Sequence, residues 1–331
     1  MADNEFLFDL KRSAEEMPLA GKTHSYFPRG EISSTARVVT QAEGPHGLYW
    51  CLDTMMYKNP DYMDASKTPM SHFHYRGYET FFVDSGSLWL FVGGQKTMVR
   101  AGDIIHLQPG QPQGMFFLDD VKWRGTYHDF EVYPEGRDVF AIKRLMPERA
   151  EDPELNAKMP RGFMDSNLME PFLTTEVPVE QCSAVKNIAR PHASYEFPGC
   201  SMRIVVERWE NGGTKELDCA VLEPGFTAVW EGYPRIRELF YVRSGKVKFT
   251  ICGKEFVADS ECVVNAPRFA PRSIEVLEPT ELYELGGQAW WSLFLRSYAS
   301  IKTYEPERLT PETLAALKER FVIPVAAIGM K

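Results

Sequence analysis

The sequence lacks the features that mark several large classes of protein. Its net charge is −9, with both signs interspersed and no basic patch, so we expect no nucleic-acid partner and no anionic membrane partner. No apolar run approaches eighteen residues, which predicts no membrane-spanning helix. The first residues, MADNEFLFDLKRSAEEM, lack a basic start followed by an apolar core, so no secretion signal is expected.

Cysteine pairs are also missing. The six cysteines form no CxxC motif and lie in apolar or strand-like segments: Cys51, Cys182, Cys200, Cys219, Cys252 and Cys262. A chain of 331 residues can bury a core that needs no covalent links. We predict reduced thiols in a cytoplasmic protein, most of them buried packing residues.

What the sequence does contain is short stretches in which apolar residues alternate. SLWLFV (87–92) and KVKFTI (246–251) place an apolar side chain at every second position, and each is followed by a glycine-bearing turn, at Gly93-Gly94 and Gly253-Lys254. This pattern is typical of strands in β-hairpins. We predict an all-β fold built from barrels or sandwiches.

The chain also repeats itself. ETFFVDSGSLWLFV begins at Glu79 and ELFYVRSGKVKFTI begins at Glu238, and 238 − 79 = 159. The glycines of the two stretches, Gly86 and Gly245, keep the same offset, since 245 − 86 = 159. A constant offset along the whole stretch predicts two copies of one β-domain.

The length and the repeat together predict a five-part organisation. We expect an irregular extension that packs across the other half (1–35), a first barrel (36–145), a surface connection (146–194), a second barrel (195–305), and a helix with a tail (306–331). In LTPETLAALKERF, Thr310 suits the N-cap and Pro311 suits the first turn of this helix.

One segment carries residues that suit metal chemistry. In PMSHFHYRGYETFFVDSG, His72 and His74 are two residues apart, so on a strand both imidazoles point to one face. A turn over residues 75–77 brings Glu79 beside them. Two imidazoles and one carboxylate hold a divalent transition metal and leave coordination positions open. The plain alternative is a strand that carries polar residues by chance.

These residues resemble a known family. HFHYRGYETFFVDSG, with HxH, four residues, Glu, six residues and Gly, resembles the first signature of the cupin superfamily, and GDIIHLQPGQPQGM (102–115) resembles the second. One departure is Ser66, where a glycine usually precedes the first histidine by six residues. The resemblance covers about residues 38–133, and through the repeat about 202–297. It implies a bicupin with two jelly-roll (double-stranded β-helix) barrels, similar to the quercetinase-type flavonol dioxygenases.

The resemblance also implies a ligand set in the first barrel. It suggests one divalent transition metal per chain (Mn, Fe or Zn), held by His72, His74, Glu79 and the position of Gln113. Many cupins have a third histidine where this chain has Gln113, and two readings stay open. Either the amide oxygen binds the metal, or Gln113 only orients the substrate.

The second copy has lost this set. An offset of 159 from His72, His74, Glu79 and Gln113 leads to Glu231, Tyr233, Glu238 and Arg272. An arginine pointing into the site would repel a cation and pair with Glu238 or Glu231. The second barrel is then a scaffold, or a second pocket with a charged floor.

Three residues are candidates for acid–base work near the metal. Glu79 is a metal ligand that can also serve as a general base, and we expect His106 to face the barrel interior and His128 to follow on a later strand. For both histidines a purely structural role is the commoner case in a barrel wall.

The resulting functional prediction is a metal-dependent enzyme that chelates an enolisable small molecule, a phenol, flavonol or 1,3-dicarbonyl, and cleaves a C–C bond. The family resemblance favours a dioxygenase. Alternatives are a hydrolase that opens a cyclic 1,3-diketone, a sugar isomerase, and a non-catalytic ligand-binding bicupin. We also expect a homodimer that pairs through barrel edges.

Overall fold

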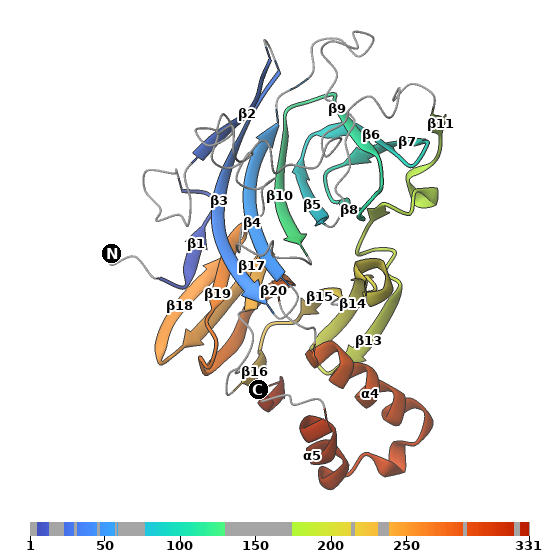
Figure 1. The fold of residues 1–331 in the computed structure, drawn as a ribbon. Helices are drawn as coiled ribbons and strands as arrows, with labels where there is room; N and C mark the ends of the chain where they lie inside the picture. The colour runs from blue at the N-terminus through green and yellow to red at the C-terminus, as the bar shows by residue number, and fades with distance from the viewer. Residues whose placement is uncertain are drawn as a thin grey trace. The chain divides into compact units, whose positions relative to one another are not determined.

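The computed structural model describes residues 5–12, 23–29, 32–44, 47–56, 58, 77–129, 174–212, 216–230, 238–286, 290–320 and 325–330. These residues form mostly β-strands, with two helices near the C-terminus (Figure 1). Contacts divide the chain into two compact units. The N-unit comprises Leu19–Ala42 and His46–Asn187, and the C-unit comprises Met1–Pro18, Glu43–Pro45 and Ile188–Lys331. The predicted all-β fold of two β-units with a C-terminal helix is confirmed.

The N-unit consists of two mostly antiparallel sheets with a core between them. The seven-stranded sheet has the order β12-β8-β5-β10-β4-β3-β2, and the four-stranded sheet has the order β11-β7-β6-β9. Their bounds are β2 Thr23–Arg29, β3 Ile32–Gly44, β4 Gly47–Met56, β5 Gly77–Ser85, β6 Ser87–Val92, β7 Gln95–Arg100, β8 Ile104–Leu107, β9 Gln113–Phe117, β10 Val121–Asp129, β11 Thr175–Glu176 and β12 Val185–Lys186. Alternate residues of both sheets, such as Phe81 and Leu90, meet in one buried cluster.

The C-unit joins the equivalent layers into one ten-stranded sheet, because two long strands run through both layers. These are β17 and β20, which pair with each other along most of their length. The strands are β1 Leu7–Asp9, β13 Ala193–Phe197, β14 Cys200–Val206, β15 Leu217–Leu222, β16 Phe226–Trp230, β17 Glu238–Ile251, β18 Lys254–Asp259, β19 Cys262–Ala266, β20 Arg272–Gly286 and β21 Val325–Met330.

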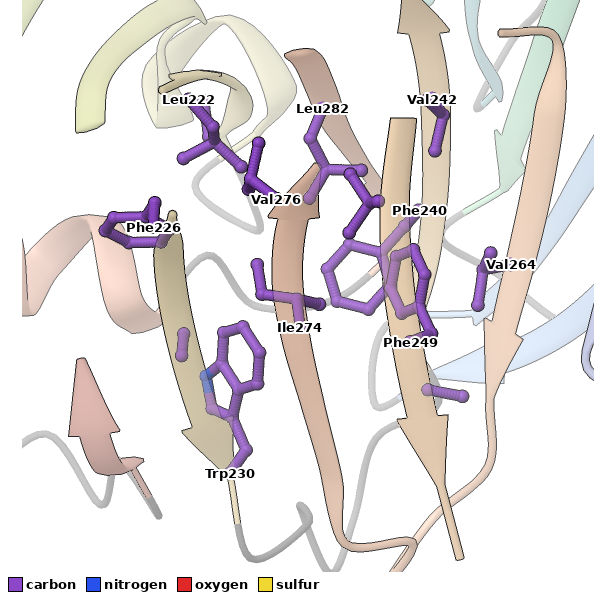
Figure 2. Packing of buried hydrophobic residues seen from close by; sticks show 14 of the residues in the cluster. Leu222, Phe226, Trp230, Phe240, Val242, Phe249, Val264, Ile274, Val276 and Leu282 are labelled. Carbon is purple, nitrogen blue, oxygen red and sulfur yellow. The ribbon is translucent and has the colours of Figure 1, made fainter. Parts of the chain in front are cut away.

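Large apolar side chains fill the interior of the C-unit. Figure 2 shows Phe226 and Trp230 of β16 and Phe240 and Phe249 of β17 among the buried side chains of this core, together with aliphatic residues such as Ile274 and Val276. The rings of Phe240 and Phe249 lie 6.0 Å apart between centroids. Burial of rings of this size is the main stabilising contribution to such a core.

The repeat is confirmed by equivalent elements. The bounds of β18 exceed those of β7 by 159 at both ends, since 254 − 95 = 159 and 259 − 100 = 159. Gly86 and Gly245 have positive φ values of 83° and 89°. A Cβ at Gly86 would clash with the backbone oxygen of Asp120, and one at Gly245 with that of Pro279, which is again 159 residues on. Both copies therefore need glycine for one close approach of two backbones.

The hairpin turns of the two copies are also equivalent, although one lies a residue earlier than predicted. Gly93 and Gly94 join β6 to β7 with φ values of 55° and 78°. In the C-unit, Cys252 and Gly253 join β17 to β18 with φ values of 50° and 77°, and Lys254 already pairs in the ladder. Two central residues with positive φ match the twist of the flanking strands.

Two helices follow the second copy, and only the later one was predicted. Helix α5 (Pro311–Arg320) begins as expected, because the Thr313 backbone N–H donates to Thr310 Oγ1 at 3.2 Å. Helix α4 (Trp290–Tyr304) lies inside the range assigned to the second barrel, and its Phe294 joins the core of the C-unit. Short 3-10 turns are η2 Val179–Gln181, η3 Arg208–Asn211 and η4 Pro306–Arg308.

Each unit has an outer strand that comes from a distant part of the chain. β1, near the N-terminus, pairs antiparallel with β19 of the second copy, with Phe8 opposite Val263. β12 pairs antiparallel with β8 of the N-unit, with Val185 opposite Ile105.

The observed boundaries differ in detail from the expected ones. The predicted irregular extension contains β2, and the division between the units falls after Asn187, inside the predicted connection. Residues 130–173 of that region lie outside the described part of the chain. Among the described helices, none is long and apolar enough to cross a bilayer.

Candidate functional site

The interior of the N-unit contains a buried polar pair at two positions singled out in the sequence. Gln113 Nε2 donates a hydrogen bond of 2.9 Å to Glu79 Oε2. Only 3% of Glu79 and 2% of Gln113 is exposed. A carboxylate buried this deeply is stabilised by hydrogen-bond donors or by a cation, and Gln113 supplies one such donor.

Strand register explains why both side chains point inward. Glu79 on β5 lies opposite Leu107 on β8, and Gln113 on β9 lies opposite Val92 on β6. Leu107 and Val92 both belong to the apolar core, and directly opposed residues share a face. Because β5 and β9 belong to different sheets, the hydrogen bond joins the two layers across the interior.

The C-unit has a pair at the equivalent positions with different chemistry. Arg272 Nη2 forms an ion pair with Glu238 Oε2, as the sequence predicted, and 3% of Arg272 and 6% of Glu238 is exposed. Arg272 lies opposite Ile251, just as Gln113 lies opposite Val92, and it also lies opposite Trp230. The guanidinium carbon is 6.0 Å from the centre of the Trp230 ring. A buried guanidinium here disfavours a metal cation.

The two predicted histidine ligands lie outside the described residues, as do positions 231 and 233 of the second copy. Among the residues that it does describe, no group of three or more His, Cys, Asp or Glu side chains could hold a metal ion.

The expectation that His106 faces the interior is wrong. His106 lies opposite Thr80, one residue along β8 from the position opposite Glu79, so its side chain is on the other face of the sheet. There it is 2% exposed, with Nδ1 at 3.0 Å from Thr80 Oγ1. The Tyr78 ring stacks on it, with 6.0 Å between ring centroids, and burial raises the pKa of Tyr78. Thr80 had not been singled out in the sequence.

The position of His128 is given by the register of β10. In the β5–β10 ladder it lies opposite Tyr78, whereas Tyr127 lies opposite Glu79. The side chains of His128 and Tyr127 are not among those described. By register, the residue of β10 nearest in the ladder to the carboxylate is Tyr127, which the sequence analysis did not select.

The outer face of the seven-stranded sheet carries a charged cluster that no sequence pattern indicated. Arg124 is 1% exposed, and its Nη1 lies 2.6 Å from Asp53 Oδ1 and 3.4 Å from Asp84 Oδ2. Burial raises the pKa of Cys51 to about 12, although nearby Arg124 acts in the opposite direction. Arg124 pairs in register with Asp53 across β10 and β4, which explains the contact.

No protein-family model and no curated protein matches the sequence. Among solved structures, the oxalate decarboxylase from Bacillus subtilis at pH 4.6 is similar, with 13% identity and a TM-score of 0.48 over 95% of this chain and 85% of that chain. A Lactobacillus farciminis oxalate decarboxylase in complex with formate has 13% identity and a TM-score of 0.49 over 94% and 96% of the two chains. Similarity at this level establishes neither a family nor an activity, and the quercetinase-like subtype stays a prediction.

Proposed function

We propose that the N-unit binds one divalent transition metal through His72, His74 and Glu79, and that the chain is an enzyme that cleaves a C–C bond of an enolisable small molecule with O₂ as co-substrate. The observation that carries this proposal is the Glu79–Gln113 contact, which sets a carboxylate into the interior at the motif position. The dioxygenase reaction itself rests on the resemblance of the motif to that of bicupins.

The donor set fits such an ion. Imidazole nitrogen and carboxylate oxygen are the usual ligands of Mn²⁺, Fe²⁺ and Zn²⁺. The carboxylate of this set, Glu79, is buried and faces inward. The repeat offers indirect support for the histidines: in the C-unit, β16 ends at Trp230 opposite Arg272, immediately before the positions equivalent to the histidines.

The two units differ in charge at one equivalent position, Gln113 in the N-unit and Arg272 in the C-unit. Two unit positive charges 4 Å apart repel by about 4 kcal/mol at the effective dielectric constant of a protein site. Arg272 brings that charge into the C-unit, whereas Gln113 is neutral. We therefore propose a single metal per chain, in the N-unit.

When bound, the metal would supply Lewis acidity that stabilises an enolate of the substrate. The protein's own contribution includes apolar neighbours of the carboxylate: Phe81 on β5 and Leu107 on β8 lie next to Glu79, and both are at least 95% buried. Low water access strengthens the hold of a carboxylate on a cation. Gln113 holds Glu79 from the opposite sheet.

A hydrolytic reaction is the second candidate. Where many cupins have an imidazole, Gln113 presents its amide nitrogen to Glu79, and losing an imidazole ligand reduces the electron supply that O₂ chemistry needs. The same site with a redox-inert metal would add water to a cyclic 1,3-diketone instead.

Elemental analysis of protein purified without added metal tests the metal site. We expect about one Mn, Fe or Zn per chain, lost in His72→Ala and His74→Ala and retained in His192→Ala and Glu238→Gln. Stoichiometric metal in both motif variants would contradict the site. Loss of metal in Glu238→Gln would contradict the assignment to the N-unit.

Assays in air and under argon separate the two reactions. A flavonol and a cyclic 1,3-diketone are incubated with metal-loaded protein, and products are identified by mass spectrometry. Cleavage that needs O₂ supports the dioxygenase. Full-rate cleavage under argon rules it out and supports hydrolysis, and metal-loaded protein that converts neither compound would favour the ligand-binding alternative.

A further inference from the structure

The amide of Gln113 has a defined orientation. Both oxygens of a carboxylate accept hydrogen bonds, so a glutamine in contact with one presents its nitrogen. Gln113 Nε2 accordingly donates to Glu79 Oε2 at 2.9 Å. Gln113 thus acts on Glu79 as a donor, in a contact that is shielded from water because both side chains are buried.

The second copy shows what this position does in the absence of the histidine motif. Arg272, the equivalent of Gln113, also directs a side-chain N–H group at the equivalent glutamate, Glu238. Glutamine and arginine differ in charge, shape and ability to bind a metal. What they share is a side-chain N–H group that reaches a glutamate. Gln113 on β9 reaches Glu79 on β5, and Arg272 on β20 reaches Glu238 on β17.

From this shared feature we infer that Gln113 is a positioning residue for Glu79 and not a metal ligand. This inference rests on the proposed function. By donating to Oε2 from the opposite sheet, Gln113 would leave the other oxygen of Glu79, Oε1, to bind the metal. Partners of this kind typically change metal affinity by about 10- to 100-fold when they are removed.

The inference makes a distinctive prediction about additivity. A residue that acts only through Glu79 has no effect once Glu79 is gone, whereas an independent ligand keeps its effect. The matching replacement is Gln113→Met, which has nearly the same length and removes the donor. Gln108→Met is the control, because Gln108 is an exposed glutamine on the turn before β9.

The experiment is a double-mutant cycle in which Mn²⁺ affinity is measured by electron paramagnetic resonance on folded protein. Circular dichroism first confirms that each variant is folded, and Glu79→Gln replaces Glu79→Ala if the alanine variant is not. We expect Gln113→Met to weaken Mn²⁺ binding about 10- to 100-fold in the wild-type background and less than about twofold without the Glu79 carboxylate. Gln108→Met should leave the affinity unchanged.

Equal weakening in both backgrounds would show that Gln113 binds the metal itself and would overturn the positioning role alone. No weakening in either background would also overturn it. Wild-type protein that takes up none of Mn²⁺, Fe²⁺ and Zn²⁺ would instead overturn the proposed function, and the role of Gln113 with it. The two failures are therefore distinguishable.

Discussion

Arg272 and Glu238 form a deeply buried ion pair in the interior of the C-unit. Removing one member of a buried pair leaves the other charge without compensation and typically costs about 3–5 kcal/mol. We expect Arg272→Met to lower the free energy of unfolding of the C-unit by that amount, measured by urea denaturation. The double variant Glu238→Gln with Arg272→Met should lose much less, and a single variant as stable as the wild type would contradict the buried pair.

Gly86 and Gly245 allow a second comparison between single residues. Alanine at either position meets a backbone oxygen and also has to adopt a positive φ. Alanine at Gly110 has only the second problem, because φ is 73° and no atom lies within 4 Å of the added Cβ. We expect Gly110→Ala to cost about 1–2 kcal/mol and the other two substitutions clearly more.

Thermal denaturation of the three alanine variants checks this order. Equal losses at Gly86, Gly245 and Gly110 would show that backbone conformation alone, and not the close approach of two strands, requires glycine at the repeated position.

At the residue scale, the sequence predicted which residues are equivalent or paired better than it predicted on which face of a sheet a side chain lies. The repeat matched Glu79 with Glu238 and Gln113 with Arg272, and the ion pair followed from charge. The facing of His106 did not follow, because β8 has only four residues, all of them buried, and shows no alternation. Only its register against β5, a long-range property, determines that His106 faces Thr80.

Among the elements, α4 is held to the C-unit by charge as well as by packing. Arg296 Nη2 lies 2.9 Å from Glu216 Oε1 and 3.2 Å from Glu207 Oε2. Burial tends to lower the pKa of Arg296, but the two carboxylates outweigh it and the pKa is raised. Glu216 is itself 3% exposed, and Arg296 compensates its charge together with Arg208, whose Nε lies 3.8 Å from Glu216 Oε1.

We expect Arg296→Met to loosen α4 selectively. Hydrogen exchange of the α4 amides, read by mass spectrometry, should accelerate about tenfold or more, while exchange in the N-unit stays the same. Lys302→Met is the control, because Lys302 is an exposed residue of the same helix. An unchanged rate in Arg296→Met would mean that packing through Phe294 and Leu295 alone holds the helix.

The two C-terminal helices, α4 and α5, differed in how well the sequence predicted them. The start of α5 has a local signal, a capping threonine followed by proline, and local signals need no tertiary context. α4 begins with WWSLF, which is rich in aromatic residues and resembles a buried strand. The spacing of Phe294, Tyr298 and Ile301 contained the helical period, and the stacking of Phe294 on Tyr298 reflects it.

On the scale of the whole molecule, the reactivity of the cysteine thiols can reveal the opening of each unit separately. None of the six is in a disulfide, and all except Cys252 are buried. Burial raises the pKa of Cys51 in the N-unit and of Cys200 in the C-unit to about 12. Because the thiolate is the reactive form, both thiols should stay unreactive at pH 8 until their unit opens.

Metal removal should therefore change thiol labelling in one unit only. We expect a chelator to accelerate alkylation of Cys51 and Cys182 several-fold, with no change at Cys200, Cys219 and Cys262, as measured by peptide mass spectrometry. Cys252 should react quickly throughout. Faster labelling of the C-unit thiols alone would place the metal in that unit.

The edge strand β1 has a consequence for expressing the C-terminal half of the chain as a separate fragment. An expression fragment that starts at Ile188 would contain the second copy without β1, and the N–H and C=O groups of β19 that pair with Leu7–Asp9 would lie open. Open edges of this kind invite intermolecular strand addition and precipitation. A separately folding C-terminal half would thus require the first dozen residues to be grafted back, for example by circular permutation.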